Sequence, residues 1–355
     1  MDLDAFDFEL PEDRIALRPA EPQDSARLLV VHGDGRLEDH TVRDLPALLD
    51  SGDVLVFNDT RVLPAALNGV RAARGPEGQD VAVQINLVEP AEGGARWHAL
   101  ARPARRLKPG DQIDIADGFA AIVEARHEGA VLLSFIVPDG DTLEGRLDRH
   151  GAMPLPPYIA RRRPADARDR ETYQTRYAGP EAKSVAAPTA GLHFTERLLA
   201  EVDARGLRRE TVRLHVGLGT FSPLDQAALR DNRLHAEWRQ VSEPAADRLN
   251  AARDAGARWV PVGTTALRTL ESAVDAAGRL APVAGPTDIF LKPGDTLRAT
   301  DALMTNFHLP RSSLFMLVCA LMGTEVMQAA YAHAIAAGYR FYSYGDACLL
   351  LPERG

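Results

Sequence analysis

Short apolar runs separated by turn residues make up the first part of the chain. Residues 28–32 and 54–57 are apolar runs of strand length, and Gly33-Asp34-Gly35 after the first run indicates a hairpin turn. A short helix is expected at residues 45–49, ending before Gly52. This pattern predicts a hairpin, a helix and then a buried strand.

The pattern changes between residues 64 and 147, where short strand-like runs follow one another without a convincing helix. Turn sequences such as Pro109-Gly110 and Asp117-Gly118 separate these runs. Regularly spaced short strands with turns at their ends are typical of a small antiparallel barrel or sandwich. The expected strands are residues 81–88, 96–101, 111–115, 119–126 and 130–137.

After a loop rich in proline and arginine at residues 150–164, helical and strand-like segments alternate to the end of the chain. Such alternation predicts a mostly parallel or mixed sheet covered by helices. We therefore expect an α/β (mixed α+β) main domain of residues 1–63 and 148–355, interrupted by an inserted antiparallel β-barrel domain of residues 64–147. The expected helices are residues 195–205, 243–255, 264–277, 312–322 and 325–337, and the expected strands are 211–216, 259–262, 341–344 and 348–351.

Composition narrows the class of protein. A chain of 355 residues with 45% hydrophobic and 26% charged residues is typical of a globular protein with two domains. The longest apolar run, residues 314–322, is too short to cross a bilayer, and no signal peptide is readable at the start. Cys319 and Cys348 form no C-x-x-C pair, which argues against a disulfide framework or a zinc site. We expect a cytoplasmic monomer that contacts no membrane and needs no metal.

Two basic clusters stand out against the net charge of −9. Each cluster has two interpretations, a solvated face with ion pairs or a surface that grips phosphates. The first consists of Arg102, Arg105, Arg106 and Lys108, and the second begins with Arg161, Arg162 and Arg163.

Several common catalytic motifs are absent from the sequence, including the P-loop, the H-E-x-x-H zinc helix and the G-x-S-x-G elbow. A G-x-G turn, Gly217 and Gly219, follows a predicted strand, but the third glycine of a dinucleotide fingerprint is missing. The turn therefore suits close backbone approach to a ligand and equally a tight turn without one.

Polar residues also gather in predicted loops before helices. In the stretch 187–195, Thr189 and Gly191 precede His193, which is either a proton carrier or a buried core histidine. The loop 305–312 concentrates Asn306, His308 and Arg311. Further candidates for binding or for acid–base chemistry are Glu237, Asp301, Tyr344 and Asp346.

Long strings spread along the whole chain resemble one family, the S-adenosylmethionine:tRNA ribosyltransferase-isomerases. They include GDVLVFNDTR, HGAMPLPPYI, SVAAPTAGLHFT, HVGLGTFSP, VGTTALRTLES, TDIFLKPG, DALMTNFHLPRSS and YRFYSYGDA. One departure is Gln23, where the family usually has arginine before the aspartate. This departure puts in doubt any role for the missing arginine. The resemblance implies a fold in which a β-barrel interrupts an α/β domain.

The resemblance implies a reaction with S-adenosylmethionine as co-substrate and ribosyl donor. The ribosyl group is transferred to 7-aminomethyl-7-deazaguanine at the wobble position of the tRNA anticodon stem-loop and isomerised, giving epoxyqueuosine, adenine and methionine. The sulfonium acidifies the neighbouring carbon, so that a positioned base can begin the reaction. For these roles we expect His193 and His308 to transfer protons and Asp301 or Glu237 to lie near the sulfonium. The donor is expected at Thr189, Gly191, Gly217 and Gly219, other substrate contacts at Asn306, Arg311, Tyr344 and Asp346, and tRNA contacts at the two basic clusters.

Two other interpretations stay open on the sequence alone. A methyltransferase that uses S-adenosylmethionine would fit the G-x-G turn, but the expected acidic residue and the β insertion are left unexplained. A non-catalytic tRNA-binding protein would fit the basic clusters, although the polar loops are chemically complete.

Overall fold

The computed structural model describes residues 3–91, 95–127, 130–180, 182–217 and 226–353, and these form two compact units. The sheet unit consists of residues 1–59, 175–178 and 188–355, and the barrel unit of residues 60–174 and 179–187. The mixed α/β fold class expected from the sequence, with a closed antiparallel barrel, is confirmed. The boundaries at residues 64 and 147 stay a prediction about domain organisation.

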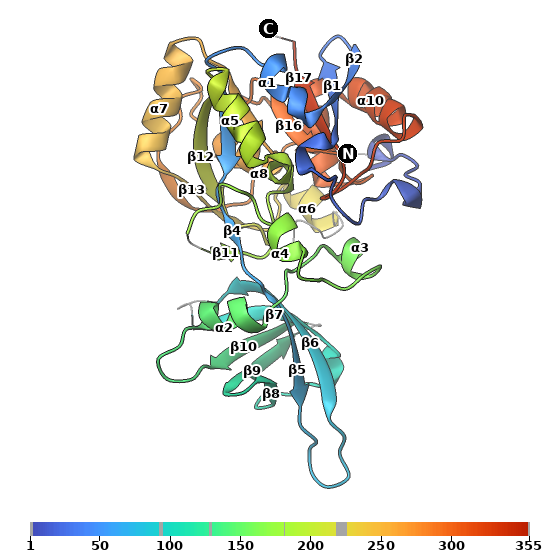
Figure 1. The fold of residues 1–355 in the computed structure, drawn as a ribbon, viewed down its shortest axis with the longest axis vertical. Coiled ribbons are helices and arrows are strands. Elements are labelled where there is room, and N and C mark those ends of the chain that lie inside the picture. Colours follow the sequence, from blue (N-terminus) through green and yellow to red (C-terminus); the bar gives the residue numbers. More distant parts are fainter. Residues whose placement is uncertain (1–2, 92–94, 128–129, 181, 218–225, 354–355) are drawn as a thin grey trace. The chain divides into compact units, whose positions relative to one another are not determined.

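A nine-stranded mixed sheet with the order β15-β13-β12-β3-β14-β16-β17-β1-β2 forms the centre of the sheet unit (Figure 1). The four neighbours β12, β3, β14 and β16 are parallel, so their carboxyl ends meet at one edge. The strands are β1 (Arg27–His32), β2 (Leu37–Thr41), β3 (Val54–Asn58), β12 (Arg208–Leu214), β13 (Glu237–Val241), β14 (Trp259–Val262), β15 (Val283–Thr287), β16 (Leu303–Asn306) and β17 (Ala347–Leu351).

Helices cover both faces of this sheet because its central strands are apolar on both sides. Leu55 and Phe57 of β3 pack in the core that contains α5, whereas Val54 and Val56 pack in the core that contains α7 and α8. A third core places α9 and α10 against β1, β16 and β17. The helices are α1 (Leu45–Leu48), α5 (Glu196–Ala204), α6 (Gln226–Asp231), α7 (Glu243–Asp254), α8 (Thr264–Glu271), α9 (Ser313–Met322) and α10 (Thr324–Ala336).

The barrel unit is built on a closed barrel with the strand order β10-β7-β6-β5-β8-β9. Along β7 buried and exposed residues alternate, as expected for a strand with one face in a core. The sequence analysis missed β5, because Asn68 and Gly69 interrupt its apolar pattern. The strands are β5 (Ala66–Arg71), β6 (Val81–Pro90), β7 (Arg96–Arg102), β8 (Gln112–Ala116), β9 (Phe119–His127) and β10 (Ala130–Ile136). Outside the barrel the unit contains β4 (Arg61–Val62), α2 (Leu143–His150), α3 (Pro157–Ala160), α4 (Asp169–Thr172) and β11 (Ala182–Ser184).

Some expected elements are wrong. Residues 341–344 form no strand, because Tyr342 has a φ of 73° and Phe341 makes only an isolated bridge to Ile15. Helix α8 ends at Glu271 rather than at residue 277, and a bridge between Val274 and Leu280 follows it. The expected loop at 150–164 contains α3. These are places where tertiary contacts override local preference.

Six short 3₁₀ helices complete the described part of the chain: η1 (Leu3–Phe6), η2 (Glu12–Arg14), η3 (Gln23–Ser25), η4 (Val42–Asp44), η5 (Ala104–Arg106) and η6 (Thr189–His193). No single helix within the described ranges is long and apolar enough to span a membrane; α9 and α10 pass that test only as a pair bent by 115°. Both contribute buried residues to the core of the sheet unit.

A buried carboxylate joins η3 to the start of α5. Asp24 is 1% exposed and accepts hydrogen bonds from the Thr195 hydroxyl at 2.6 Å and from Arg197 at 2.7 Å. Burial acts to raise the pKa of Asp24, but these donors outweigh burial and lower the pKa below its usual range. Thr195 also caps α5 by accepting from the Leu198 backbone at 3.2 Å.

We therefore expect the substitution Asp24→Asn to lower the free energy of unfolding at pH 7 by on the order of 2 kcal/mol, because charged hydrogen bonds are lost in a buried setting. The carboxylate stabilises the fold above its unfolded pKa of about 4, so the difference from the wild type should shrink as the pH falls below that value. Urea unfolding at several pH values measures both effects.

The matched control is Asp254→Asn, which removes a surface carboxylate that is 61% exposed and paired with Arg279. Its effect should stay below about 0.5 kcal/mol. Equal losses for the two variants would contradict the role given to Asp24.

Candidate functional site

The candidate site lies at the carboxyl edge of the four parallel strands, where Asn58 ends β3. The Asn58 side chain donates to the Leu214 carbonyl at 3.0 Å and to the Thr265 hydroxyl at 3.1 Å, and accepts from the Leu214 backbone at 3.1 Å. It therefore ties the ends of β3 and β12 to the first turn of α8. Ligands of open α/β sheets bind at this edge.

Three residues predicted from the sequence meet at the end of β16. The Thr189 hydroxyl donates to Asn306 Oδ1 at 2.9 Å, and Asn306 Nδ2 lies 3.3 Å from His193 Nε2. Helix η6 carries Thr189 and His193, and its Ala190 lies against Gly263 at the end of β14. The structure thus brings Thr189, His193 and Asn306 into one polar cluster.

His193 is held as a neutral imidazole. Burial lowers its pKa to about 4, although the Asp346 carboxylate and a hydrogen bond with the Gln23 backbone act in the opposite direction. The contact with residue 23 uses the backbone, so it does not depend on the side chain that replaces the usual arginine. Neutral His193 is able to accept a proton or to hold a ligand by hydrogen bonding.

His308 lies on the other face of β16. Leu303 packs in the core of α9 and α10, whereas Met304 packs in the core of α5. Because side chains alternate along a strand, Thr305 lies on the face of α9 and α10 and Asn306 on the face of α5. His308 Nε2 lies 3.2 Å from the Thr305 hydroxyl, and burial lowers the pKa of His308 to about 3. The two histidines expected to transfer protons therefore lie on opposite faces of the sheet.

Glu237, the first residue of β13, joins the carboxyl edge. Its carboxylate accepts from the Gly217 backbone at 3.1 Å and pairs with Arg268 of α8. Arg268 is 3% exposed, and its Nε and Nη2 have no hydrogen-bond partner in the described part of the chain. The sequence analysis missed Arg268, because an arginine within an amphipathic helix resembles a surface residue. Gly219 lies outside the described residues.

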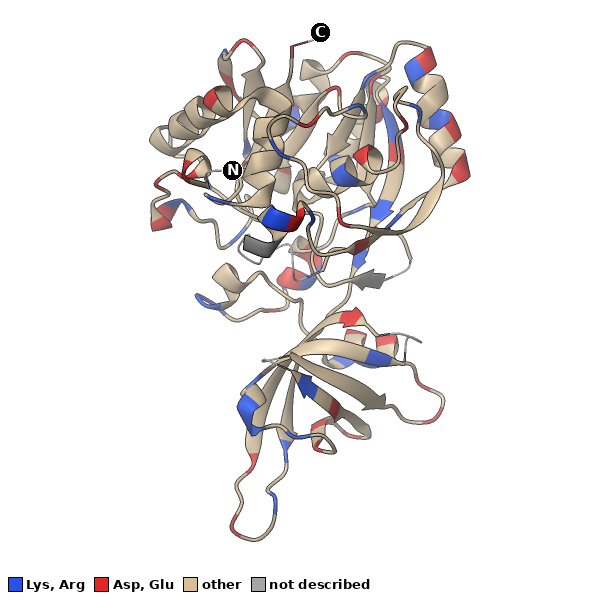
Figure 2. Ribbon diagram, turned by 180° about the vertical axis from the view of Figure 1, so that it is seen from behind, with Lys and Arg blue, Asp and Glu red and all other residues tan. Residues whose placement is uncertain are grey.

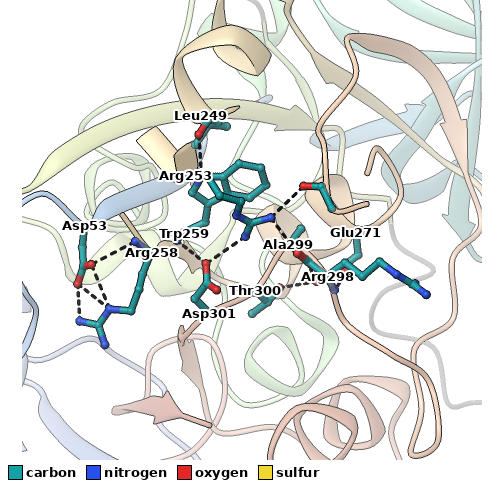
Figure 3. A network of polar contacts seen from close by, with 11 residues as sticks. Asp53, Leu249, Arg253, Arg258, Trp259, Glu271, Arg298, Ala299, Thr300 and Asp301 are labelled. Carbon is teal, nitrogen blue, oxygen red and sulfur yellow. Dashed lines mark hydrogen bonds and ion pairs between the residues drawn. The ribbon is translucent and has the colours of Figure 1, made fainter. Parts of the chain in front are cut away.

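Asp301 does not join these residues (Figure 3). It precedes β16 and accepts from the Trp259 backbone at 2.8 Å, at the start of β14 and thus at the opposite edge of the sheet. Its carboxylate also pairs with Arg253 at 3.1 Å. Near it Glu271 accepts from the backbones of Arg298 and Ala299, and Arg258 pairs with Asp53 (Figure 3). Asp301 therefore stabilises the amino edge.

Asp346 and Arg311 have partners within the protein. The Asp346 carboxylate accepts from the backbones of Arg27 at 3.1 Å and Arg340 at 2.8 Å, and it shapes the turn before β17. Its carbonyl lies 3.5 Å from Asn306 Nδ2, so the turn supports the cluster indirectly. Arg311 is half exposed and pairs with Asp4. Tyr344 is buried and belongs to the same turn as Asp346.

Tyr177 is a residue of this edge that the sequence analysis did not single out. Its ring packs on Phe57 at 4.5 Å, and its hydroxyl is buried without a hydrogen-bond partner among the described residues. A Cβ atom at Gly191 would lie 1.7 Å from the Tyr177 hydroxyl, so only glycine fits there. Burial, together with nearby Asp59, raises the pKa of Tyr177 far above its usual value. Asp59 itself pairs with Arg213 through two contacts of 2.8 Å.

The first basic cluster is exposed on the barrel unit, between the end of β7 and β8 (Figure 2 shows the charged residues). Its loop is fixed by Asp111, which accepts from Arg74 and from the Lys108 backbone at 2.7 Å. In the second cluster Arg161 and Arg162 are exposed, whereas Arg163 pairs with buried Asp169 through two contacts of 2.7 Å. The exposed members of the first cluster are Arg102, Arg105, Arg106 and Lys108.

Within the described ranges no group of three or more His, Cys, Asp or Glu side chains is placed to hold a metal ion. The polar groups of the carboxyl edge are amides, hydroxyls, imidazole, a carboxylate and a guanidinium. They suit a polar organic ligand with charged groups.

The fold and this edge define an α/β protein with a candidate site of polar residues at the strand ends. The family described as queuosine biosynthesis protein matches residues 3–350. An S-adenosylmethionine:tRNA ribosyltransferase-isomerase of Hyphomonas neptunium is 70% identical over 352 residues, which cover 99% of this chain and 100% of the relative. A protein of the same name from Methylobacterium radiotolerans is 57% identical, covering 99% and 98%.

Among solved structures, an S-adenosylmethionine tRNA ribosyltransferase of Thermotoga maritima is similar, with a TM-score of 0.55 and 31% identity. The similarity covers 98% of this chain and 100% of that one. The chain belongs to the queuosine biosynthesis protein family. The family resemblance expected from the sequence is confirmed.

The two buried histidines generate a prediction about pH. An unfolded histidine takes up a proton below pH 6.5, whereas folded His193 and His308 do so only near pH 4 and pH 3. The unfolded chain therefore binds more protons, and the free energy of unfolding should fall as the pH falls from 6.5 to 5, by up to about 1.4 kcal/mol per pH unit for each histidine. Urea unfolding of the wild type and of His193→Asn and His308→Asn measures this slope.

Each histidine variant should lose part of the slope. The control Leu317→Ala truncates a buried side chain of α9 that does not titrate, so it should lower stability equally at each pH. Unchanged slopes in both histidine variants would contradict the neutral state assigned to these imidazoles.

Proposed function

We propose that this protein transfers the ribosyl group of S-adenosylmethionine to 7-aminomethyl-7-deazaguanine at the wobble position of tRNA and isomerises it. The products are epoxyqueuosine in tRNA, adenine and methionine. The observation that carries this proposal is the match over residues 3–350, together with 70% identity to a relative that bears this enzyme's name. A monomeric, cytoplasmic enzyme stays a prediction from the sequence.

The donor is proposed to bind at the carboxyl edge. Its sulfonium is a cation, and two buried carboxylates expected from the sequence lie at this edge, Glu237 and Asp346. The Asp346 carboxylate is held within its own turn by the backbones of Arg27 and Arg340 and by the Arg340 side chain, which leaves Glu237 as the proposed partner of the sulfonium. We assign the role to Glu237 rather than to Asp301, because Asp301 is engaged at the opposite edge. Thr189, Gly191 and Gly217 line the same edge and are proposed to hold the donor.

His193 and Asn306 are proposed to handle a proton and to orient the substrate. The Asn306 amide is fixed by the Thr189 hydroxyl at 2.9 Å, so its Nδ2 faces the imidazole. A neutral imidazole can take a proton from the carbon next to the sulfonium or from the aminomethyl group. His308, on the other face of β16, is proposed to support the strand end rather than to contact substrate.

The decisive experiment incubates the purified protein with S-adenosylmethionine and a tRNA that carries 7-aminomethyl-7-deazaguanine. We expect release of adenine and methionine and a matching gain in mass of the tRNA nucleoside, both measured by mass spectrometry. Formation of S-adenosylhomocysteine with a methyl gain would show methyl transfer instead. RNA binding without turnover would indicate a binding protein.

The same assay tests the choice between the two carboxylates. Glu237→Gln keeps the shape but removes the charge at the carboxyl edge, and we expect turnover to fall by at least about a hundredfold. Asp301→Asn is the matched control and should keep turnover within a few-fold of the wild type. The opposite order of effects would show that the sulfonium lies at the amino edge.

The exposed basic residues of the barrel unit are proposed to contact the phosphates of the anticodon stem-loop. Arg105→Glu combined with Arg106→Glu should weaken tRNA binding and flatten its dependence on salt, because fewer counterions are released. The control Arg279→Glu also replaces an exposed arginine by glutamate, but on the sheet unit, where Arg279 pairs with Asp254. Equal affinities and equal salt slopes for the barrel variant and the wild type would refute this placement.

A further inference from the structure

Three neighbouring strands at one end of the sheet, β12, β13 and β15, have one face, here called the open face, whose described residues are fully or partly exposed to solvent. Register places Arg213 opposite Gln240, and places Trp238 and Gln240 opposite Pro286 and Ala284. Paired residues share a face of the sheet. The residues on this face are Thr211, Arg213, His215, Trp238, Gln240, Ala284 and Pro286.

The opposite side of the same strands is buried. Val212 and Val241 pack in the core that contains α7, and Leu214 is fully buried. On the open side Thr211 pairs with Phe57 of β3, whose ring belongs to the α5 core, but Thr211 itself is exposed. The α5 core therefore ends at β3, and the outer strands extend beyond it.

Two aromatic rings stand on this face. His215 and Trp238 are stacked with centroids 4.9 Å apart and planes at 14°, and the His215 backbone donates to the Trp238 carbonyl at 2.8 Å. Trp238 is 39% exposed, whereas Trp97 and Trp259 are 6% and 0% exposed. Among the large hydrophobic side chains in the described part of the sheet unit, Trp238 is the exposed one. The stacked pair therefore presents a flat aromatic surface to solvent, on which another flat ring can stack.

We propose that Trp238 and His215 form a stacking site for an unpaired nucleobase in the loop of the RNA substrate. This inference rests on the proposed function and names a contact that it leaves open. A single strand exposes the flat faces of its bases, and stacking on aromatic side chains is the usual way to bind them.

The surroundings of the pair favour RNA over other occupants. None of the seven residues of this face is acidic, and Arg213 compensates the nearby Asp59 carboxylate through two contacts of 2.8 Å. The face therefore does not repel phosphates. Thr211, Arg213 and Gln240 also place hydrogen-bonding side chains around the aromatic pair, as the edges of an unpaired nucleobase require.

The position of the pair connects it to the proposed chemistry. Trp238 follows Glu237 in the chain, and His215 lies two residues before Gly217, whose backbone donates to the Glu237 carboxylate at 3.1 Å. Trp238 and Glu237 point to opposite faces of β13, so a base stacked on Trp238 would lie at the carboxyl edge, on the face away from the Glu237–Arg268 pair. In this position the site fixes the path of the loop while another nucleotide reacts.

The test uses the full chain and a synthetic anticodon stem-loop RNA with 7-aminomethyl-7-deazaguanine in its loop. We compare Trp238→Ala with Trp238→Phe, which keeps an aromatic face, and with Trp238→Leu, which keeps apolar bulk alone. Dissociation constants come from fluorescence anisotropy at several salt concentrations, for the stem-loop and for a fully paired RNA of equal length. Calorimetry measures the binding of S-adenosylmethionine.

We expect Trp238→Ala and Trp238→Leu to weaken stem-loop binding about tenfold and Trp238→Phe to recover most of the affinity. The salt slope and the affinity for paired RNA should not change, because no phosphate contact is lost. Affinity of Trp238→Ala within about twofold of the wild type would overturn the proposal. So would equal affinities of the leucine and phenylalanine variants, or a loss confined to S-adenosylmethionine.

These outcomes are separate from those of the proposed function. Release of adenine by the wild type tests the reaction, whereas the Trp238 series compares affinities and needs no turnover. A wild type that releases adenine, with a Trp238→Ala variant of full RNA affinity, would leave the reaction standing and remove the stacking site.

Discussion

The site depends on the side-chain amide of Asn58 at the end of β3. Two parallel strands end and helix α8 begins near this residue, and each brings backbone groups that need partners. Asn58 satisfies the Leu214 backbone in both directions and still reaches the Thr265 hydroxyl of α8. Because an unpaired polar group in this buried place would cost free energy, the amide fixes how β3, β12 and α8 meet. Gly217, Glu237 and Arg268 take their positions from that junction.

The two edges of the sheet use polar residues in different ways. At the amino edge, the carboxylates bind partners within the fold. Asp53 pairs with Arg258, and Asp301 pairs with Arg253 and accepts a hydrogen bond from the Trp259 backbone. At the carboxyl edge, some buried groups make no hydrogen bond with the described residues. They are the Nε and Nη2 atoms of Arg268 and the Tyr177 hydroxyl. Buried groups without partners are exceptional in folded proteins, and these two are among several in the described part of the chain.

Burial determines the chemistry available to the imidazoles. His193 and His308 lie on opposite faces of β16, and burial keeps both neutral at pH 7. A neutral imidazole beside a fixed amide is a proton acceptor rather than a cation that would repel a sulfonium. The open face with Trp238 and His215 lies on the same unit, and the exposed arginines lie on the barrel unit. The two units thus expose different kinds of side chain, aromatic rings on the sheet unit and arginines on the barrel unit.

The sequence by itself determined the strands and helices with strong periodicity, the β insertion and the family, because these follow from local patterns and from long strings that are rarely matched by chance. It also put Thr189, His193 and Asn306 among the candidates. Only the tertiary structure decided which candidates meet. Asp301 and Asn306 are five residues apart in the sequence but lie at opposite edges, because β16 runs between them. The two-residue period of β16 places His308 and His193 on opposite faces of the sheet. Arg268 and Trp238 could not be singled out from the sequence, because their contacts with Glu237 and His215 join residues that are distant in the chain.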